Sequence, residues 1–230
     1  EQHHDRFVAA VRAKQPLPRG RYASTVVAPC MGACPAGVDI PAYVEQLRID
    51  EVERSAEAVR RRCPMPATIG RVCVRPCEDA CRRGSVDEPV AIRTLKRFVA
   101  DTEAEPVVEP LPGKPRVAII GAGPAGLACA NYLGANGIKS TIFEALPEAG
   151  GMAAVGIPEY RLPRQVLRSE VERVEALGVE IRYNFRFGVD ATMDDLFNQG
   201  YEAMFVAVGA HQSARMGCEG EDAGYDGFMP

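Results

Sequence analysis

A glycine-rich turn near the middle of the chain constrains the fold more than any other feature. The string Gly-Ala-Gly-Pro-Ala-Gly at 121–126 follows the short predicted strand 116–120 and opens a helical pattern over 124–136. A second predicted strand, 140–144, comes after Asn136-Gly137. A strand, a turn, a helix and a second strand in this order form a β-α-β unit, which implies a parallel sheet with a right-handed crossover. The sequence therefore predicts an α/β domain from residue 116 onward.

The same turn predicts a dinucleotide site. Its first glycine permits the tight turn, its second lets the backbone approach a pyrophosphate, and its third lets the helix pack close to the strand. The helix start adds free N–H groups and a partial positive charge. Glu144 closes the second strand about 20 residues further on, where a carboxylate can accept hydrogen bonds from a ribose diol. An ordinary glycine turn would need neither the preceding strand, nor the following helix, nor Glu144. The glycine motif alone does not distinguish an FAD site from a site for a nicotinamide nucleotide.

Six of the eight cysteines lie between Cys30 and Cys81, and such clustering indicates disulfides, zinc or iron–sulfur ligation. The first residues lack the apolar stretch of a signal peptide, so we expect reduced thiols in a cytoplasmic protein, which favours a metal. Zinc sites usually show paired Cys-x2–4-Cys knuckles, whereas Cys73, Cys77 and Cys81 are spaced four apart. Four thiolates would satisfy a [4Fe–4S] cluster. The spacing favours iron–sulfur, with zinc as the alternative.

Helical patterns surround the cysteines. They cover 41–47, with Asp39 as a candidate cap, then 51–62 and 89–100, and no strand pattern interrupts them. Residues 101–115 are acidic and hold four prolines, as expected at a domain boundary. We predict a lead-in over 1–27, an all-helical domain over 28–104, a linker over 105–115 and a Rossmann-like β-α-β domain over 116–230.

Further patterns complete the second domain. They predict a helix over 163–177, a strand over 179–183, a short helix over 193–197 and a strand over 203–208.

Composition excludes other classes of protein. The 27 basic and 31 acidic residues give a net charge of −4, which argues against a nucleic-acid-binding surface. No apolar run reaches the roughly 18–20 residues of a membrane span. Apolar residues make up 47 % of the chain, enough for a core and too many for wholesale disorder.

The second half resembles a known family. The string Gly-Ile-Pro-Glu-Tyr-Arg-Leu-Pro at 156–163 is its most specific match, supported by Gly150-Gly151-Met152, Ala207-Val208-Gly209-Ala210 and Glu219-Gly220-Glu221-Asp222. These strings are similar to the small (β) subunit of bacterial glutamate synthase and to related NAD(P)H-dependent, FAD-containing electron-transfer subunits. The cysteine half resembles the helical iron–sulfur domain of the same family, through residues 30–41, 70–84 and 89–98.

This resemblance implies FAD, at least one [4Fe–4S] cluster, and NAD(P)H as electron donor or acceptor. The residues expected at FAD are Gly121, Ala122, Gly123, Pro124, Ala125, Gly126, Glu144, Gly151, Met152, Arg161, Val189 and Gly209. No catalytic side chain is expected, because the flavin itself performs the redox chemistry.

By the same resemblance, Cys34, Cys73 and Cys77 are expected to ligate one cluster. Cys30 and Cys81 are either remnants of a second cluster or the source of the fourth ligand. Cys63 is an additional candidate that the family pattern does not contain.

The chain also departs from the family. No Cys-x2-Cys pair precedes Cys30, and Ile69 stands where the family often has a cysteine. Lys96 lies near the place of a non-cysteine ligand in one relative, but a protonated lysine has no lone pair to give. Six thiols satisfy one cluster and fall short of two, so a second cluster would need other ligands or a partner chain.

The expected function is electron transfer. The resemblance implies a subunit that passes electrons between FAD, the cluster and a larger redox partner, such as glutamate synthase, hydrogenase or formate dehydrogenase subunits. The nicotinamide-binding motif and the last FAD-binding segment of the family do not occur in residues 1–230. We therefore expect the flavin fold to be incomplete at the C-terminus, with the rest supplied by a longer chain or a partner. The alternative is a non-catalytic electron-relay or docking module.

Overall fold

The computed structural model describes residues 27–101, 115–210 and 217. The expected lead-in over 1–27 and the linker over 105–115 lie almost wholly outside the described residues. The chain forms two compact units. Within the described part, the first unit comprises residues 27–62 and 74–95, and the second comprises 63–73, 96–101, 115–210 and 217.

The described part of the first unit contains helices and no strand. Its helices are α2 (Pro29–Ala33), α3 (Ile40–Arg48), α4 (Val52–Arg60), α6 (Pro76–Asp79), the 3-10 helix η1 (Arg82–Ser85) and the first residues of α7 (Ile92–Asp101). Asp39 caps α3 by accepting a hydrogen bond from the Ala42 N–H at 3.1 Å. Helix α3 packs on α4, and α2 packs on α6. The predicted helices over 41–47, 51–62 and 89–100 are thus confirmed.

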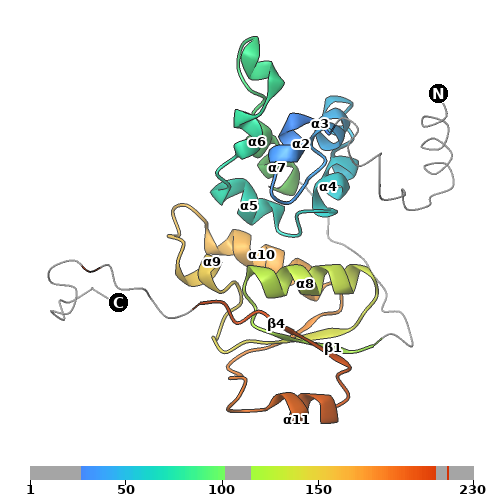
Figure 1. Ribbon diagram of the computed structural model, residues 1–230, viewed down its shortest axis with the longest axis vertical. Helices are drawn as coiled ribbons and strands as arrows, with labels where there is room; N and C mark the ends of the chain where they lie inside the picture. Colours follow the sequence, from blue (N-terminus) through green and yellow to red (C-terminus); the bar gives the residue numbers. More distant parts are fainter. Residues whose placement is uncertain (1–26, 102–114, 211–216, 218–230) are drawn as a thin grey trace. The chain divides into compact units, whose positions relative to one another are not determined.

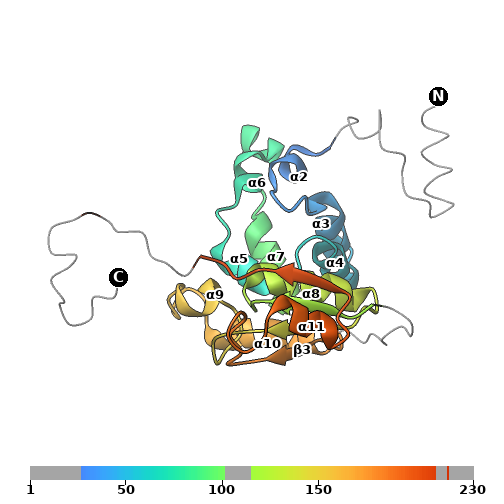
Figure 2. The ribbon, with the colours of Figure 1, turned by 60° about the horizontal axis from the view of Figure 1, so that its bottom comes forward.

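The second unit is built on a four-stranded parallel sheet. Its strands are β1 (Val117–Ile120), β2 (Ser140–Phe143), β3 (Glu180–Arg182) and β4 (Ala203–Val206), in the order β3-β2-β1-β4. Val117 pairs with Ser140 on one side and with Ala203 on the other. Strands β3 and β4 therefore form the two edges of the sheet (Figure 2). The predicted α/β architecture is confirmed.

Helices cover both faces of this sheet (Figure 1). Helices α8 (Pro124–Ala135) and α10 (Arg164–Glu175) lie on one face, and α11 (Met193–Asn198) lies on the other. The short helix α9 (Met152–Val155) precedes α10. Alternate strand residues feed the two cores: Ile119 and Ile142 pack on the α8 side, and Ile120 and Phe143 pack on the α11 side.

Helix α5 (Pro66–Val72) is a feature that the sequence pattern did not predict. It lies in the cysteine-rich part of the sequence but packs with the second unit. Met65 belongs to the same core as Ile119, and Val72 packs against that core. The compact units therefore divide the chain differently from the predicted domain limits, which stay a prediction.

None of the described helices is both long and apolar enough to cross a membrane.

Candidate cofactor sites

The glycine turn between β1 and α8 is shaped by two close backbone approaches. Gly121 has φ +103°, a conformation that suits glycine, and a Cβ there would overlap the carbonyl oxygen of Ala207. A Cβ on Gly126 would overlap the carbonyl oxygen of Gly121. The first and third glycines are thus needed for the turn itself and for the contact between helix and strand, as the motif predicts.

The start of α8 offers hydrogen-bond donors at this turn. The helix begins at Pro124, which has no N–H, and the Leu127 N–H donates to the Gly123 carbonyl at 2.9 Å. The N–H groups of Ala125 and Gly126 belong to the first turn, where a helix provides no acceptor of its own. The Gly150 N–H donates to the Ala122 carbonyl at 2.8 Å. This hydrogen bond connects the Gly150-Gly151 segment to the glycine turn at 121–126.

Glu144 is buried directly after β2, with 5 % of its surface exposed. One carboxylate oxygen accepts a hydrogen bond from the Ala122 N–H at 2.6 Å, and the other accepts one from the Leu146 N–H at 2.8 Å. Glu144 thus connects the end of β2 to the middle of the glycine turn. Each carboxylate oxygen retains further acceptor capacity, which a ribose hydroxyl could use.

A cavity of about 350 Å³ opens at this carboxyl edge of the sheet. Eight of the residues expected at FAD line it: Gly121, Gly123, Pro124, Ala125, Glu144, Gly151, Met152 and Gly209. Ala122 and Gly126 do not line it, but Ala122 bonds to Glu144 and Gly126 lies against the Gly121 carbonyl. Arg161 and Val189 are exposed and do not line the cavity. The binding role of each residue stays a prediction.

Some lining residues were missed in the sequence. Phe185, Arg186 and Phe187 follow β3, and the Phe143 and Phe185 rings lie 4.6 Å apart between centroids. The available signal was topological: the carboxyl ends of parallel strands meet at one edge, so residues just after β3 reach the same site as those after β1. With its glycine cradle, buried acid and aromatic wall, the cavity fits part of a dinucleotide.

In the first unit, three of the candidate metal-binding cysteines lie near one buried tyrosine. Cys30 lies in α2 and Cys77 in α6, which pack on each other, and Cys34 caps α2. Tyr43 is fully buried and donates a hydrogen bond to the Ile92 carbonyl at 2.8 Å. Burial raises the pKa of Tyr43, and the nearby charges of Cys77, Cys30, Cys34 and Glu78 raise it further. These three thiols therefore share one neighbourhood.

Cys81 lies in an environment that favours a thiolate. A hydrogen bond from the backbone of Val90 lowers the pKa of the Cys81 thiol, with smaller contributions from the backbone of Arg83 and Gly84. Backbone donors aimed at sulfur stabilise the deprotonated form, which is the form that ligates iron.

Cys63 and Cys73 belong to the second unit. Cys63 is 5 % exposed, and Cys73 is the C-cap residue of α5, with its N–H donating to the Ile69 carbonyl at 2.9 Å. The six predicted cysteine ligands are thus divided between the two units.

Within the described ranges, no three His, Cys, Asp or Glu side chains are gathered as a single bound metal ion requires. An iron–sulfur cluster needs a looser arrangement, because each thiolate binds a different iron atom of the cluster. Soft thiolate donors in a partly buried helical unit fit such a cluster by their chemistry.

Comparison with known proteins identifies the family of each part of the chain. Residues 20–107 match a family described as dihydropyrimidine dehydrogenase domain II, 4Fe-4S cluster, and residues 115–229 match the pyridine nucleotide-disulphide oxidoreductase family. The expected iron–sulfur and FAD-type domains are thereby confirmed at the level of the family.

Three curated relatives span both parts of the chain. The beta subunit of the NADP(+)-dependent formate dehydrogenase of Moorella thermoacetica is 50 % identical over 91 % of this chain and 33 % of its own length. The beta subunit of the NADPH-Fe(3+) oxidoreductase of Geobacter sulfurreducens (strain DL-1 / KN400) is 47 % identical over 97 % of this chain and 34 % of its own. The glutamate synthase [NADPH] small chain of Escherichia coli (strain K12) is 37 % identical, over 84 % and 42 %. The chain spans less than half the length of these relatives.

Proposed function

We propose that this chain, which belongs to the pyridine nucleotide-disulphide oxidoreductase family, is the electron-transfer part of an NAD(P)H-dependent oxidoreductase. One observation carries the proposal. The same chain contains a cavity lined by the glycine turn and the buried Glu144, and a helical unit in which several cysteines lie near one another. When bound, FAD exchanges electron pairs with a nicotinamide and single electrons with a [4Fe–4S] cluster.

The chain's own residues bind and orient FAD. The turn at 121–126 leaves room for a pyrophosphate against backbone N–H groups, and the dipole of α8 favours its negative charge. Glu144 holds the turn through Ala122 and accepts hydrogen bonds from the ribose. Phe143 and Phe185 form an apolar wall that excludes water from the same cavity.

Cys34, Cys73 and Cys77 ligate one cluster, and Cys30 or Cys81 supplies the fourth thiolate. The proximity of Cys30, Cys34 and Cys77 to Tyr43 supports the members of this set that lie in the first unit, and the lowered pKa of Cys81 supports its candidacy as the fourth ligand. Cys63 is the weakest candidate, because the family pattern contains no cysteine at this position.

The partner is a larger redox subunit, and the complex is cytoplasmic. The names of the relatives support a complex of several subunits, because each is called a beta subunit or a small chain. Cytoplasmic conditions would keep the clustered thiols reduced and available for iron.

The test is composition and reduction of the native complex that contains this chain. After anaerobic purification we expect flavin, iron and acid-labile sulfide, and bleaching of both chromophores by NADPH or NADH. Iron–sulfur absorption without flavin would favour the relay or docking module instead. Zinc in place of iron, with no acid-labile sulfide, would contradict the proposal.

A further inference from the structure

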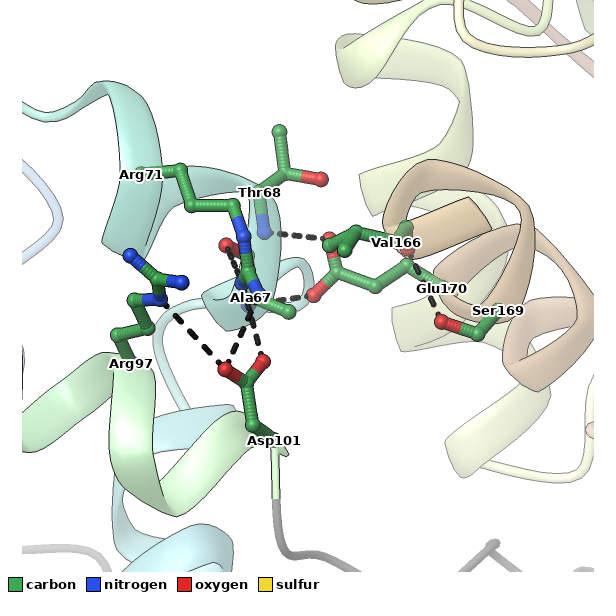
Figure 3. A network of polar contacts seen from close by, with 8 residues as sticks. All are labelled: Ala67, Thr68, Arg71, Arg97, Asp101, Val166, Ser169 and Glu170. Carbon is green, nitrogen blue, oxygen red and sulfur yellow. Dashed lines mark hydrogen bonds and ion pairs between the residues drawn. The ribbon is translucent and has the colours of Figure 1, made fainter. Parts of the chain in front are cut away.

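A buried carboxylate of the flavin-binding unit holds the first turn of α5. Glu170 lies in α10 and is 4 % exposed. Its two oxygens accept hydrogen bonds from successive backbone N–H groups, from Ala67 at 2.7 Å and from Thr68 at 2.9 Å (Figure 3). These N–H groups belong to the first turn of α5, which has no side-chain cap of its own. A residue from a distant part of the sequence therefore serves as the helix cap.

The other side of α5 is held by the end of α7. Arg71 makes two hydrogen bonds of 3.0 Å to the carboxylate of Asp101, and only 9 % of the Arg71 side chain is exposed. A Cβ on Gly70 would lie 3.0 Å from the Cα of Arg97, so the two helices approach closely there. Figure 3 shows Glu170 and Asp101 reaching α5 from different helices. Helix α5 is thus fixed from two directions within one compact unit.

The fixed position of α5 bears directly on Cys73. This cysteine is the C-cap residue of the helix, and its N–H is bonded to Ile69 inside the helix. A short α-helix is rigid, so fixing the position of its first turn also fixes the position of its last residue. Cys73 therefore has a defined place in the unit that also contains the glycine turn and its cavity.

We propose that Glu170 is a positioning residue for electron transfer, which acts by fixing α5 and thereby Cys73 in the flavin-binding unit. The inference rests on the proposed function, in which Cys73 is an iron ligand. Glu170 touches neither cofactor in this role. It sets where the Cys73 sulfur can lie relative to the flavin, through two backbone hydrogen bonds.

The test compares Glu170→Gln with Glu172→Gln in the native complex. Gln keeps the shape of Glu170 but turns one acceptor into a donor that faces a backbone N–H. Glu172 is an exposed residue of the same helix and receives the same substitution as a control. Hydrogen–deuterium exchange reports on α5 without need of any cofactor. We expect amides of α5 to exchange about tenfold to hundredfold faster in Glu170→Gln, with α8 unchanged.

The second readout is the appearance of the reduced-cluster EPR signal after NAD(P)H reduces the flavin. In Glu170→Gln we expect this signal to appear about tenfold more slowly, with flavin content and flavin reduction as in wild type. Glu170→Asp, which keeps the charge on a shorter arm, gives an intermediate result and serves if the first variant does not fold.

Unchanged exchange in α5 overturns the inference. So does faster exchange in α5 with an unchanged rate of cluster reduction, because Glu170 would then stabilise the helix without positioning the cluster. A wild-type complex that gives no iron–sulfur EPR signal would instead overturn the proposed function and the inference together.

Discussion

Gly126 and Gly123 lie three residues apart in the glycine turn, but a methyl group has different consequences at each. At Gly126 the new Cβ would overlap the Gly121 carbonyl oxygen, which belongs to the rigid backbone of the turn. We expect Gly126→Ala to lower the free energy of unfolding by at least about 3 kcal/mol, because neither backbone can move away without breaking the contact between helix and strand. Thermal unfolding measures the change.

Gly123→Ala separates binding from folding. Gly123 has φ −73°, and a Cβ there meets nothing within 4 Å. We expect stability to change by less than about 0.5 kcal/mol and FAD affinity to fall about tenfold to hundredfold, because the methyl group occupies space that the pyrophosphate needs. Flavin titration measures the affinity. Unchanged affinity in Gly123→Ala would mean that FAD does not use this turn.

Glu144→Gln tests the acid that closes the cavity. The substitution leaves one acceptor oxygen for two backbone donors, from Ala122 and Leu146, at a buried site. We expect a loss of about 1–3 kcal/mol in the free energy of unfolding, together with weaker FAD binding. Glu148→Gln, at an exposed position of the following loop, is the matched control and should change neither quantity.

At the scale of elements, α11 has the most complete cap among the described helices with a side-chain cap. The Thr192 hydroxyl accepts from the Asp195 N–H, and the Asp195 carboxylate accepts from the Thr192 N–H at 2.9 Å. The hydrogen bond from the Thr192 side chain lowers the pKa of Asp195, and the Thr192 backbone N–H adds to the effect. This stabilisation is complete above the ordinary aspartate pKa of about 4 and is lost as the pH falls through the lowered value.

Thr192→Ala should therefore raise the pKa of Asp195 toward its ordinary value and reduce amide protection in α11 by about fivefold. NMR titration of the Asp195 carboxyl and hydrogen exchange measure the two effects. Thr192→Ser keeps the hydroxyl and serves as the control. If the pKa of Asp195 is the same in wild type and Thr192→Ala, the capping box does not form in solution.

The elements that the sequence predicted are those whose signal is local. Short strand patterns on either side of the glycine turn and its helix indicate β1 and β2, and Asp39 with Pro41 indicates the start of α3. The glycine turn is recognisable because its spacing reports directly on backbone conformation. Periodicity and spacing need only neighbouring residues, so one sequence suffices to find them.

The elements that the sequence did not predict depend on distant partners. Helix α5 begins after Met65, which provides no side-chain cap, and is completed by Glu170. The sequence near residue 66 contains no signal that predicts this hydrogen bond to the distant Glu170 carboxylate. The aromatic residues Phe185 and Phe187 reach the cavity only because β3 lies beside β2 in a parallel sheet. Local sequence patterns therefore located the glycine turn of the dinucleotide site and missed the aromatic residues that line the same cavity.

At the scale of the whole molecule, the candidate cluster ligands are distributed over two units joined by several crossings of the chain. The chain passes from one unit to the other after Arg62, after Cys73 and, within α7, after Leu95. Cys34 and Cys77 belong to the first unit and Cys73 to the second. The proposed ligand set therefore draws on segments of both units.

Removing iron should then affect the two units unequally. The described part of the first unit has about 60 residues, a size at which a hydrophobic core alone is marginal, and three of its thiols lie near buried Tyr43. The second unit has a four-stranded sheet covered by helices on both faces and needs no metal for its core. Because binding energy at a structural metal site becomes folding energy, chelation should raise hydrogen exchange in α3 and α4 at least about tenfold and leave β1 and α8 nearly unchanged.

Restoring iron and sulfide anaerobically should reverse the effect. Equal exchange in α3 and α4 before and after chelation would show that the first unit folds without its cluster, and that the thiols serve electron transfer alone.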